Sequence, residues 1–397
     1  MEKSDLTLLI EINNYNLNFL VVRKEQNNFT TIHNIDVIID GFNNNSFTNF
    51  DKACASIKEN IYLLEKKLNF TFQEAILILE KFNPTYVNVS GYKRLNGSQI
   101  SRENITYILN TLKSYVDLIE TKKTIIHIFN TNFYLDNKRI ENLPIGLFGD
   151  FYSHELSFSL INKNDYKNLK NIFDTCSLKI KKILLKSFVK GAYISNIKKN
   201  TETFFQIRIG ENNTKIFFFE NNSLKFEQDF KFGTNIIIKD ISKITYLKTE
   251  IVKKILDKIE FEKENFNNEI IDPQFFEDDI NRKIKKKLIR DIIEARIQEI
   301  FEIIILKNVN LKYYDKIVKA IFLEITDHSN LKCLKEIFRT VFTNNNKIDV
   351  NFIDSLPNET MLNTIQELVH FGWKKEAIPI SYPKKSLVTR FFDILFG

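Results

Sequence analysis

Two stretches of the chain share one pattern, in which a nearly unbroken apolar run, a short polar turn and a second apolar run follow each other. The first stretch consists of Leu6–Ile12 (LTLLIEI), the turn NNYN and Leu17–Val22. The second consists of Phe204–Ile209 (FFQIRI), the turn GENNT and Lys215–Phe219. Apolar runs of this length, bounded by turn residues, predict buried strands and hence two hairpins. Because one hairpin opens each half, the pattern indicates a duplicated α/β architecture.

Residues 85–162 have a different pattern, in which strands with alternating apolar and polar positions surround one helix. Ser101 is a predicted N-cap, and the apolar residues of Arg102–Ile119 recur at helical spacing. The predicted strands are Tyr86–Tyr92, Thr124–Phe129, Phe133–Asp136 and His154–Ile161. We therefore expect an inserted strand–helix–strand–strand subdomain.

Helices and short buried strands alternate through the remaining chain. The other predicted helices are Asp51–Leu68, Asn164–Phe173, Phe188–Ser195, Asp240–Leu256, a long one over 279–306, Leu331–Phe342 and Glu359–His370. The other predicted strands are Ala75–Leu79, Leu178–Leu185, Ile317–Glu324 and Ile348–Ile353. The predicted subdomains are a first core (1–84 and 163–197), the insertion (85–162), a second core (198–237 and 311–372), a helical partner-binding part (238–310), a linker (373–383) and a last helix (384–397).

The last helix, Lys384–Gly397, is strongly amphipathic, with aromatic and aliphatic residues on one side and Thr389, Arg390 and Asp393 on the other. Such a face beside cations is what an interfacial membrane helix needs. The alternative is a last helix that packs on the protein's own core. The preceding Lys374–Lys385, with two prolines, indicates a tether outside any packed domain. The predicted membrane-binding residues are Lys384, Lys385, Leu387, Val388, Arg390, Phe391, Phe392, Ile394, Leu395 and Phe396.

Composition narrows the class of protein. The chain has 397 residues, is 43% apolar and 27% charged, and carries a net charge of +7, as expected of a globular protein. No apolar run reaches the roughly eighteen residues of a spanning helix, and no signal peptide opens the chain, so we expect a cytoplasmic protein. Three separated cysteines predict neither a disulfide framework nor a metal site. The lysines are dispersed, which argues against nucleic-acid binding, and His127 is predicted to be a satisfied core residue.

Several short segments, taken in order, resemble the FtsA family of bacterial division proteins, which belongs to the actin-like ATPase superfamily. Val87–Tyr92 (VNVSGY) resembles the family's V-x-V-S-G entry to its inserted subdomain. The other similar segments are Ile126–Asp136, Leu143–Gly149 (LPIGLFG), Gly233 with Asp240, Thr249–Lys253 (TEIVK) and Ile292–Ile300 (IIEARIQEI). With the last helix added, the resemblance covers nearly the whole chain.

The resemblance implies an actin-like, duplicated ribonuclease-H-like fold with two lobes, an inserted subdomain and a C-terminal amphipathic helix. It also implies a peripheral-membrane adaptor that tethers FtsZ filaments during septum formation. The implied place is the cytoplasmic face of the inner membrane at the division site. The implied partners are the FtsZ C-terminal tail, an anionic membrane surface, further copies of the chain in a filament, and other division proteins.

The resemblance breaks down at the loops that would bind ATP or ADP. Members of the superfamily place D-x-G-(T/S) in the first hairpin, where this chain has Glu11, Ile12, Asn13 and Asn14. The carboxylate would organise the waters of a metal, and the glycine would let backbone N–H groups approach phosphate. Glu11 keeps a carboxylate, but Asn13 replaces the glycine.

The second hairpin would read D-x-G-G-G-T-x-D, and this chain retains only Gly210 and Thr214, with Arg208 in the place of the metal carboxylate. An arginine there repels Mg²⁺, although it can itself meet a phosphate. The adenosine-side glycine pair is missing from Glu324–Leu334. Glu250 and Lys253 complete the positions that the resemblance assigns to nucleotide. We expect no ATPase activity, no catalytic residue and no metal site, with ATP or ADP binding left open.

The densest basic run, Arg282–Arg290 (RKIKKKLIR), has two interpretations. It can be a solvated helical face, or it can receive an acidic peptide. The resemblance places the FtsZ tail on this helical part, with Lys285, Lys286, Arg290 and Arg296 supplying the complementary charge.

Two other functions stay open from the sequence. One is a working actin-like ATPase or a kinase-like phosphotransferase. The other is a pilus-assembly adaptor that resembles PilM.

Overall fold

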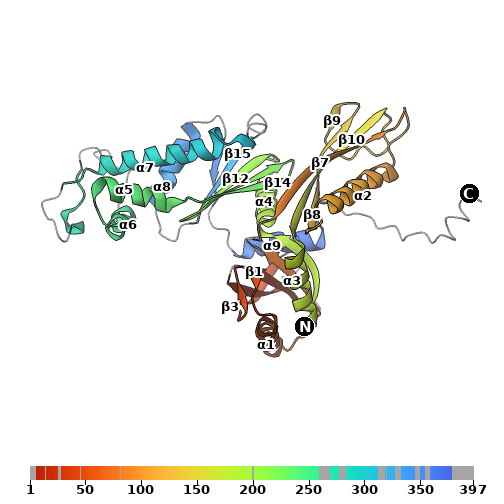
Figure 1. The fold of residues 1–397 in the computed structure, drawn as a ribbon, viewed down its shortest axis with the longest axis horizontal. Helices are drawn as coiled ribbons and strands as arrows, with labels where there is room; N and C mark the ends of the chain where they lie inside the picture. The colour runs from red at the N-terminus through yellow and green to blue at the C-terminus, as the bar shows by residue number, and fades with distance from the viewer. Residues whose placement is uncertain are drawn as a thin grey trace, which may run out of the picture. The chain divides into compact units, whose positions relative to one another are not determined.

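The computed structural model describes residues 6–13, 15–25, 28–44, 46–80, 82–198, 201–258, 269–276, 283–311, 318, 320–326, 332–344, 349–353 and 358–377. The chain divides into two compact units, which are drawn in Figure 1. Unit 1 consists of Met1–Gln26, Thr30–Lys186 and Glu367–Gly397, and unit 2 consists of Asn27–Phe29 and Ser187–Gln366. The predicted last helix lies outside the described residues.

Unit 1 contains a five-stranded sheet in the order β11-β6-β1-β2-β3. Strand β1 pairs antiparallel with β2 and parallel with β6, which confirms the first predicted hairpin. Its strands are β1 Leu6–Ile12, β2 Asn16–Glu25, β3 Asn28–Ile38, β6 Glu74–Leu79 and β11 Lys179–Leu185; the unit also holds helices α1 Phe50–Leu68 and α3 Lys163–Thr175 and the short pair β4 Phe42–Asn43 and β5 Ser46–Phe47.

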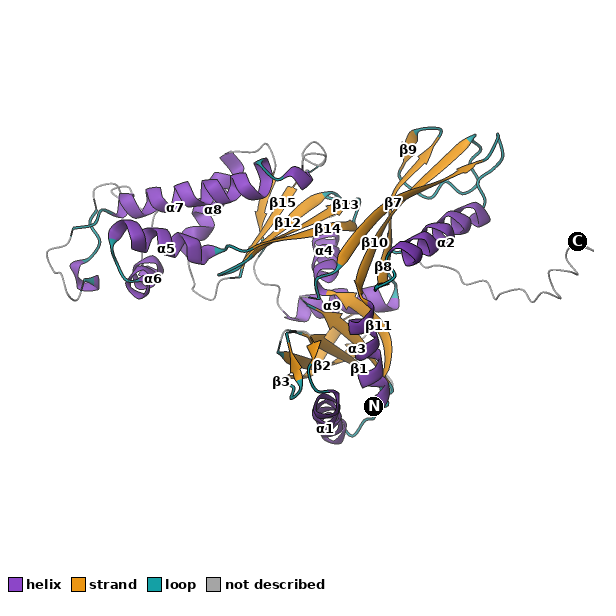
Figure 2. Ribbon diagram, viewed as in Figure 1, coloured by secondary structure: helices purple, strands orange, loops and turns teal. Residues whose placement is uncertain are grey.

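The insertion in unit 1 is a four-stranded sheet in the order β7-β10-β8-β9 (Figure 2). Its strands are β7 Thr85–Arg94, β8 Lys123–Leu135, β9 Lys138–Ile140 and β10 Phe151–Asn162, and helix α2 (Arg102–Ile119) contacts β7, β8 and β10. Ser101 caps α2 in a capping box with Asn104, as predicted. The predicted break between Phe129 and Phe133 is wrong, because Asn130 and Asn132 hydrogen-bond to side chains of β10 and let β8 continue.

The segment Lys374–Ala377, predicted as part of a free tether, packs on β8 instead. The Asn130 N–H donates to the Lys375 carbonyl and the Ala377 N–H donates to the Ile128 carbonyl, each over 2.7 Å. Glu376 bonds to His127 and to Lys182, both over 2.9 Å. The buried His127 is therefore a satisfied core residue, as expected. These backbone bonds and ion pairs fix a segment whose proline-rich continuation lies outside the described residues.

Unit 2 contains a second five-stranded sheet in the order β14-β13-β12-β15-β16. Strand β12 pairs antiparallel with β13 and parallel with β15, which confirms the second predicted hairpin. Its strands are β12 Phe204–Ile209, β13 Thr214–Glu220, β14 Ser223–Phe230, β15 Ala320–Ile325 and β16 Asp349–Phe352. Helix α4 (Lys186–Ile197) precedes the sheet in the chain, and α8 (Lys332–Asn344) and α9 (Asn358–His370) follow β15 and β16.

The helical part of unit 2 departs from prediction at two places. The predicted helix Asp240–Leu256 is two helices, because Tyr246 takes a left-handed conformation with φ of 54° and ends the first. The predicted helix over 279–306 begins at Lys286, since Ile284 and Lys286 form backbone hydrogen bonds with residues 269–271. The observed elements are α5 Thr234–Thr245, α6 Thr249–Lys258, a 3-10 helix Pro273–Phe275, α7 Lys286–Phe301, a π-helical turn Glu302–Leu306 and a 3-10 helix Val309–Leu311.

A large apolar core joins the sheet of unit 2 to these helices. It includes Ile207 and Phe218 from the hairpin, Ile241 from α5, and Ile293 and Phe301 from α7. The core fixes α5 and α7 against each other, and this contact positions the groove described below. No helix among the described residues is long and apolar enough to cross a membrane.

Candidate functional site: a groove between α5 and α7, and two predicted phosphate loops

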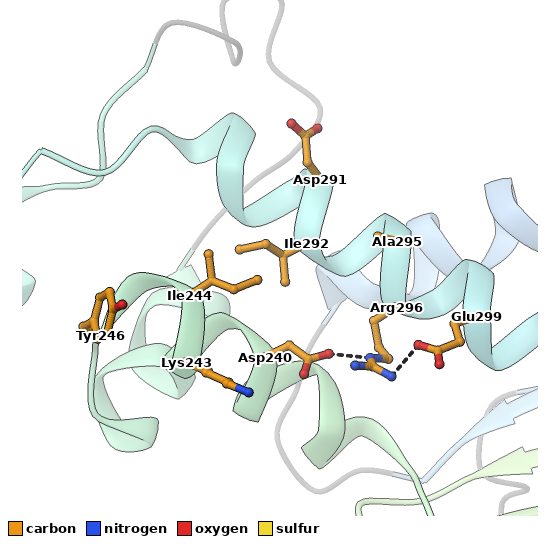
Figure 3. A pocket seen from close by; sticks show the side chains of 9 residues that line it. All are labelled: Asp240, Lys243, Ile244, Tyr246, Asp291, Ile292, Ala295, Arg296 and Glu299. Atoms are coloured by element: carbon orange, nitrogen blue, oxygen red, sulfur yellow. Dashed lines mark hydrogen bonds and ion pairs between the residues drawn. The ribbon is translucent and has the colours of Figure 1, made fainter.

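A groove of about 890 Å³ lies between α5 and α7 (Figure 3). It combines an apolar centre with charged residues from both helices. The residues that line it are Asp240, Lys243, Ile244, Tyr246, Asp291, Ile292, Ala295, Arg296 and Glu299.

The sequence of α5 explains why apolar side chains face this groove. Ile237, Ile238 and Ile241 form the buried stripe of the helix. Ile244 and Tyr246 lie outside that stripe at the end of the helix, where 51% of Ile244 and 86% of Tyr246 is exposed. An exposed isoleucine and tyrosine beside a groove can bury apolar surface against a partner.

Arg296 is held by carboxylates from within the site. Its Nε donates to Asp240 and its guanidinium also bonds to Glu299, as the dashed lines in Figure 3 show. The hydrogen bond to Asp240 has the largest influence on the pKa of Arg296, and together with the attraction of Asp240 and Glu299 it outweighs the effect of burial and raises that pKa. Arg296 therefore joins α5 to α7 and has much of its charge neutralised within the groove.

The other three residues predicted to bind an acidic tail do not line the groove. Lys286 pairs with Glu269, and Arg290 pairs over 2.7 Å with Glu294 one turn further along α7. Lys285 is exposed at the N-cap of α7. Of the four residues predicted to bind the FtsZ tail, Arg296 is the one that lines the groove. A role for the other three in binding the tail stays a prediction.

The charge of the groove differs from the basic face that the sequence suggests. Two cations, Lys243 and Arg296, and three carboxylates, Asp240, Asp291 and Glu299, give it a formal charge of −1. Lys243 has no ion-pair partner among the described residues. The arrangement suits a peptide with apolar anchors better than one held by charge alone.

The first predicted phosphate loop, between β1 and β2, lies beside a cluster of one lysine and two carboxylates. Lys186, the first residue of α4, bonds to Glu11, and its Nζ lies 3.0 Å from an oxygen of Glu80. The Asn13 N–H donates to the Asn16 carbonyl over 3.1 Å and closes the turn. Asn14 lies outside the described residues. The carboxylate assigned to a metal is thus bound to an ammonium group of the same chain.

The second predicted phosphate loop, between β12 and β13, is bound to the start of α5. The N–H groups of Thr234 and Asn235 donate to the carbonyls of Gly210 and Glu211, each over 2.9 Å. The Gly210 N–H donates to the Asn213 carbonyl over 2.8 Å. A phosphate-binding loop needs such donors to face the ligand, and here they bond within the protein.

The remaining residues of this predicted nucleotide site also bond within the protein or lie apart from the loops. The Thr214 hydroxyl donates to the Phe232 carbonyl over 2.8 Å. Glu250, on the first turn of α6, is exposed and accepts a hydrogen bond from Thr249, and Lys253 is half-buried on the same helix. Arg208 lies on β12 opposite Glu324 of β15. Glu11, the Gly210 N–H and the Thr214 hydroxyl are thus each bonded to other groups of the protein, an arrangement that does not fit a magnesium–nucleotide complex held by these three groups.

The predicted membrane-binding residues between Lys384 and Phe396 lie outside the described residues. The sequence analysis missed Lys243, Ile244, Tyr246, Asp291 and Glu299 in the groove, and Lys186 and Glu80 beside the first loop. The sequence did contain one signal of the groove: Ile244 and Tyr246 are apolar residues outside the buried stripe of α5.

No protein-family model matches the chain. Among curated proteins, the chain is similar to "Cell division protein FtsA" of Buchnera aphidicola subsp. Schizaphis graminum, with 21% identity over 269 residues, 67% of this chain and 63% of that protein. It is 20% identical over 368 residues to FtsA of Buchnera aphidicola subsp. Acyrthosiphon pisum, covering 90% of this chain and 87% of that protein. The alignment with FtsA of Bacillus subtilis gives 22% identity over 77% of this chain and 70% of that protein. These alignments support a relationship to FtsA.

The chain is also similar to a solved structure titled "PilM-PilN type IV pilus biogenesis complex", with a TM-score of 0.51 and 8% sequence identity over 92% of this chain and 98% of that chain. At this identity the likeness shows the fold alone. The fold is actin-like. The mixed α/β arrangement with a sheet in each unit confirms the predicted fold class, and the predicted subdomain boundaries stay predictions.

Proposed function

We propose that this chain is an FtsA-like adaptor of cell division that joins FtsZ filaments to the cytoplasmic face of the membrane. The observation that carries the proposal is the alignment with a curated FtsA over 90% of this chain and 87% of that protein. Bonding within the protein at both predicted phosphate loops, together with an open groove between α5 and α7, supports a scaffold rather than an enzyme. The likeness to PilM concerns the fold and does not favour a pilus role.

In this proposal the groove between α5 and α7 binds the C-terminal tail of FtsZ. Ile244 and Tyr246 supply apolar contact on α5, while Lys243 meets an acidic residue of the tail. Lys287 is exposed on α7 one turn before Asp291 and therefore lies on the same helical face as the groove residues Asp291 and Ala295. The apolar contacts provide most of the affinity, because the groove carries a formal charge of −1.

Fluorescence anisotropy with a labelled FtsZ tail peptide tests the groove. Tyr246→Ala weakens binding about tenfold, since exposed tyrosines at the centre of an interface often contribute more than about 1 kcal/mol. Tyr62→Ala is the matched control, because Tyr62 is an exposed tyrosine on a helix of unit 1. Equal affinity of both variants would remove the groove from the proposal, and lack of binding by the wild-type chain would contradict the FtsZ partnership itself.

The segment Lys384–Gly397 provides the membrane anchor in this proposal. The last described residue before it, Ala377, is bonded to Ile128 of β8. A single short amphipathic helix binds a membrane weakly and reversibly, and many helices presented together bind firmly. The anchor therefore requires assembly of the protein behind it.

Co-sedimentation with anionic vesicles tests the anchor. The full chain pellets with vesicles and a chain that ends at Pro383 does not. Phe391→Asp abolishes pelleting, whereas Thr389→Asp, which adds the same charge to the polar side of the predicted helix, weakens it much less. Equal pelleting of the full and shortened chains would contradict the anchor.

Assembly in this proposal uses the insertion. Four apolar residues of one loop, Leu143, Ile145, Leu147 and Phe148, are exposed beside the four-stranded sheet. Adjacent exposed apolar residues favour contact with another protein surface. In analytical ultracentrifugation, Phe148→Asp shifts the chain toward monomer, and Ile38→Asp, an exposed position of β3, does not. An unchanged distribution for Phe148→Asp would exclude this loop from assembly.

The proposed adaptor has no ATPase activity, and ATP or ADP is not required for it to fold. The support is that Glu11 and the N–H groups near Gly210 and Thr234 already have partners within the protein. In-line attack of water on a phosphate needs a positioned metal ion and a water-positioning residue. Phosphate release by the full chain in the presence of ATP and Mg²⁺ is expected to equal the release without protein.

A further inference from the structure

The cluster of Lys186, Glu11 and Glu80 brings three charges together at the carboxyl end of one sheet. Glu11 lies near the end of β1, and Glu80 directly follows β6, the parallel neighbour of β1. The Glu80 N–H donates to the Ile12 carbonyl over 3.1 Å, which holds the two strand ends together. One Nζ thus reaches a carboxylate from each of two adjacent strands.

These charges are largely withdrawn from water. The side chains of Lys186 and Glu11 are each 18% exposed, and that of Glu80 is 8% exposed. Burial lowers the pKa of Lys186, but the attraction and hydrogen bonds of Glu80 and Glu11 outweigh burial and raise the pKa above its ordinary value of 10.5. Lys186 is therefore protonated at neutral pH. Two carboxylates in such surroundings require a positive charge.

We propose that the Lys186 ammonium group takes the place of the metal cation at this loop, so that the chain's own side chain holds the first hairpin closed. Magnesium prefers one or two carboxylates together with phosphate oxygens, and here the carboxylates are bound to a cation that cannot diffuse away. The consequence goes beyond the absence of hydrolysis. In this proposal, unit 1 keeps its structure without nucleotide or divalent cation.

The proposal makes a specific prediction for the chain without this lysine. Lys186→Ala removes the ammonium group that Glu11 and Glu80 share, and a divalent cation can then bind at these two carboxylates. An ordinary structural ion pair would lose stability on the same substitution without gaining a response to metal. The response to metal therefore separates a replaced cation from an ion pair that is only structural.

Thermal unfolding of the full chain, with and without millimolar MgCl₂ or CaCl₂ at constant ionic strength, tests the proposal. The wild-type Tm does not respond to either cation. Lys186→Ala lowers the Tm by about 5 °C, and a divalent cation restores a large part of that loss. The matched control is Lys181→Ala, which removes a Lys–Glu pair of the same sheet whose side chains are 44% and 49% exposed, and which changes the Tm little.

Two further variants keep the test decisive if Lys186→Ala does not fold. Lys186→Gln removes the charge but keeps a hydrogen-bond donor on a side chain one atom shorter, and its Tm is also raised by divalent cations. The double variant E11Q/K186M removes one negative and one positive charge, recovers stability relative to Lys186→Ala, and loses the response to metal. A wild-type Tm that rises with Mg²⁺, or a Lys186→Ala or Lys186→Gln variant that ignores both cations, would overturn the proposal. Neither result bears on the groove or on the membrane anchor.

Discussion

The two hairpins, β1–β2 in unit 1 and β12–β13 in unit 2, start from one sequence pattern, and different physical interactions join each of them to the helix beside it. The first is held by side-chain charge, since Lys186 bonds to Glu11 beside the turn. The second is held by backbone hydrogen bonds, since the carbonyls of Gly210 and Glu211 accept from the first N–H groups of α5. A fold can therefore be retained while its ligand-binding groups bond to each other in two chemically unrelated ways.

Because the interactions differ, the two hairpins are sensitive to different substitutions. At the first hairpin, removing the charge of Lys186 would leave the Glu11 carboxylate without this cation in a poorly solvated site. The second depends on close approach of two backbones, which a single added carbon atom prevents. The predictions below use these two dependences, starting with the largest expected effect.

The largest effect is expected beside the second hairpin, where Lys190 bonds to both oxygens of Glu324 over 2.8 and 2.9 Å and both side chains are buried. Lys190→Met leaves the Glu324 carboxylate buried without that partner. We expect a loss of about 3–5 kcal/mol in the free energy of unfolding, measured by urea denaturation. In K190M/E324Q most of the loss is recovered, because no net charge is left buried. If Lys190→Met had the same free energy of unfolding as the wild type, the Lys190–Glu324 pair would not stabilise unit 2.

The next effect comes from the close backbone contact at the second hairpin. A Cβ atom at Gly233 would lie 2.0 Å from the Gly210 carbonyl oxygen and 2.7 Å from backbone atoms of Glu211. Gly233→Ala is expected to cost about 2–3 kcal/mol, because the hairpin has to move away from α5. Gly372→Ala is the control, since a Cβ there has no neighbour within 4 Å and adds only the strain of a φ of 73°. Equal losses in urea denaturation would mean that the two backbones are not in tight contact.

Alkaline pH separates the two hairpins with a smaller effect. Because the folded-state pKa of Lys186 is raised above 10.5, its stabilisation is fully present below 10.5 and is lost as the pH rises through the folded pKa. The wild type should exceed Lys186→Met by about 2 kcal/mol at neutral pH, and the difference should shrink above 10.5. The backbone bonds of the second hairpin contain no side chain that titrates, so the cost of Gly233→Ala should not change. A difference between the wild type and Lys186→Met that stays constant to the highest pH would exclude the charge as the cause.

The sequence predicts the elements whose residues are buried in unbroken runs, and it misses one edge strand of each five-stranded sheet. Both hairpins follow from the apolar runs of β1, β2, β12 and β13. The edge strands β3 and β14 were not predicted, because they interleave polar residues such as His33, Asp36 and Glu227 with apolar ones. The end of α5 was missed because a left-handed residue there is usually glycine or asparagine, and the chain has Tyr246.

Of the groove between α5 and α7, the sequence predicted only the residue that lies in a recognisable local motif. Arg296 lies in a segment that resembles the FtsA family, and it does line the groove. Its partner Asp240 lies 56 residues away, so the neutralisation of its charge was not visible in the sequence. The same holds for Glu11 and Lys186, which are 175 residues apart. The loop sequences predict weakened nucleotide binding, but only the fold shows that Lys186 bonds to Glu11 beside the first loop.

The most direct test of the central claim, that both loops are closed without nucleotide, is the Tm of the full chain with ATP or ADP, each with and without Mg²⁺. The account predicts no shift under any of these conditions, because a ligand stabilises a protein only in proportion to its binding to the folded state. A shift of several degrees that requires both nucleotide and Mg²⁺, accompanied by phosphate release from ATP, would contradict it.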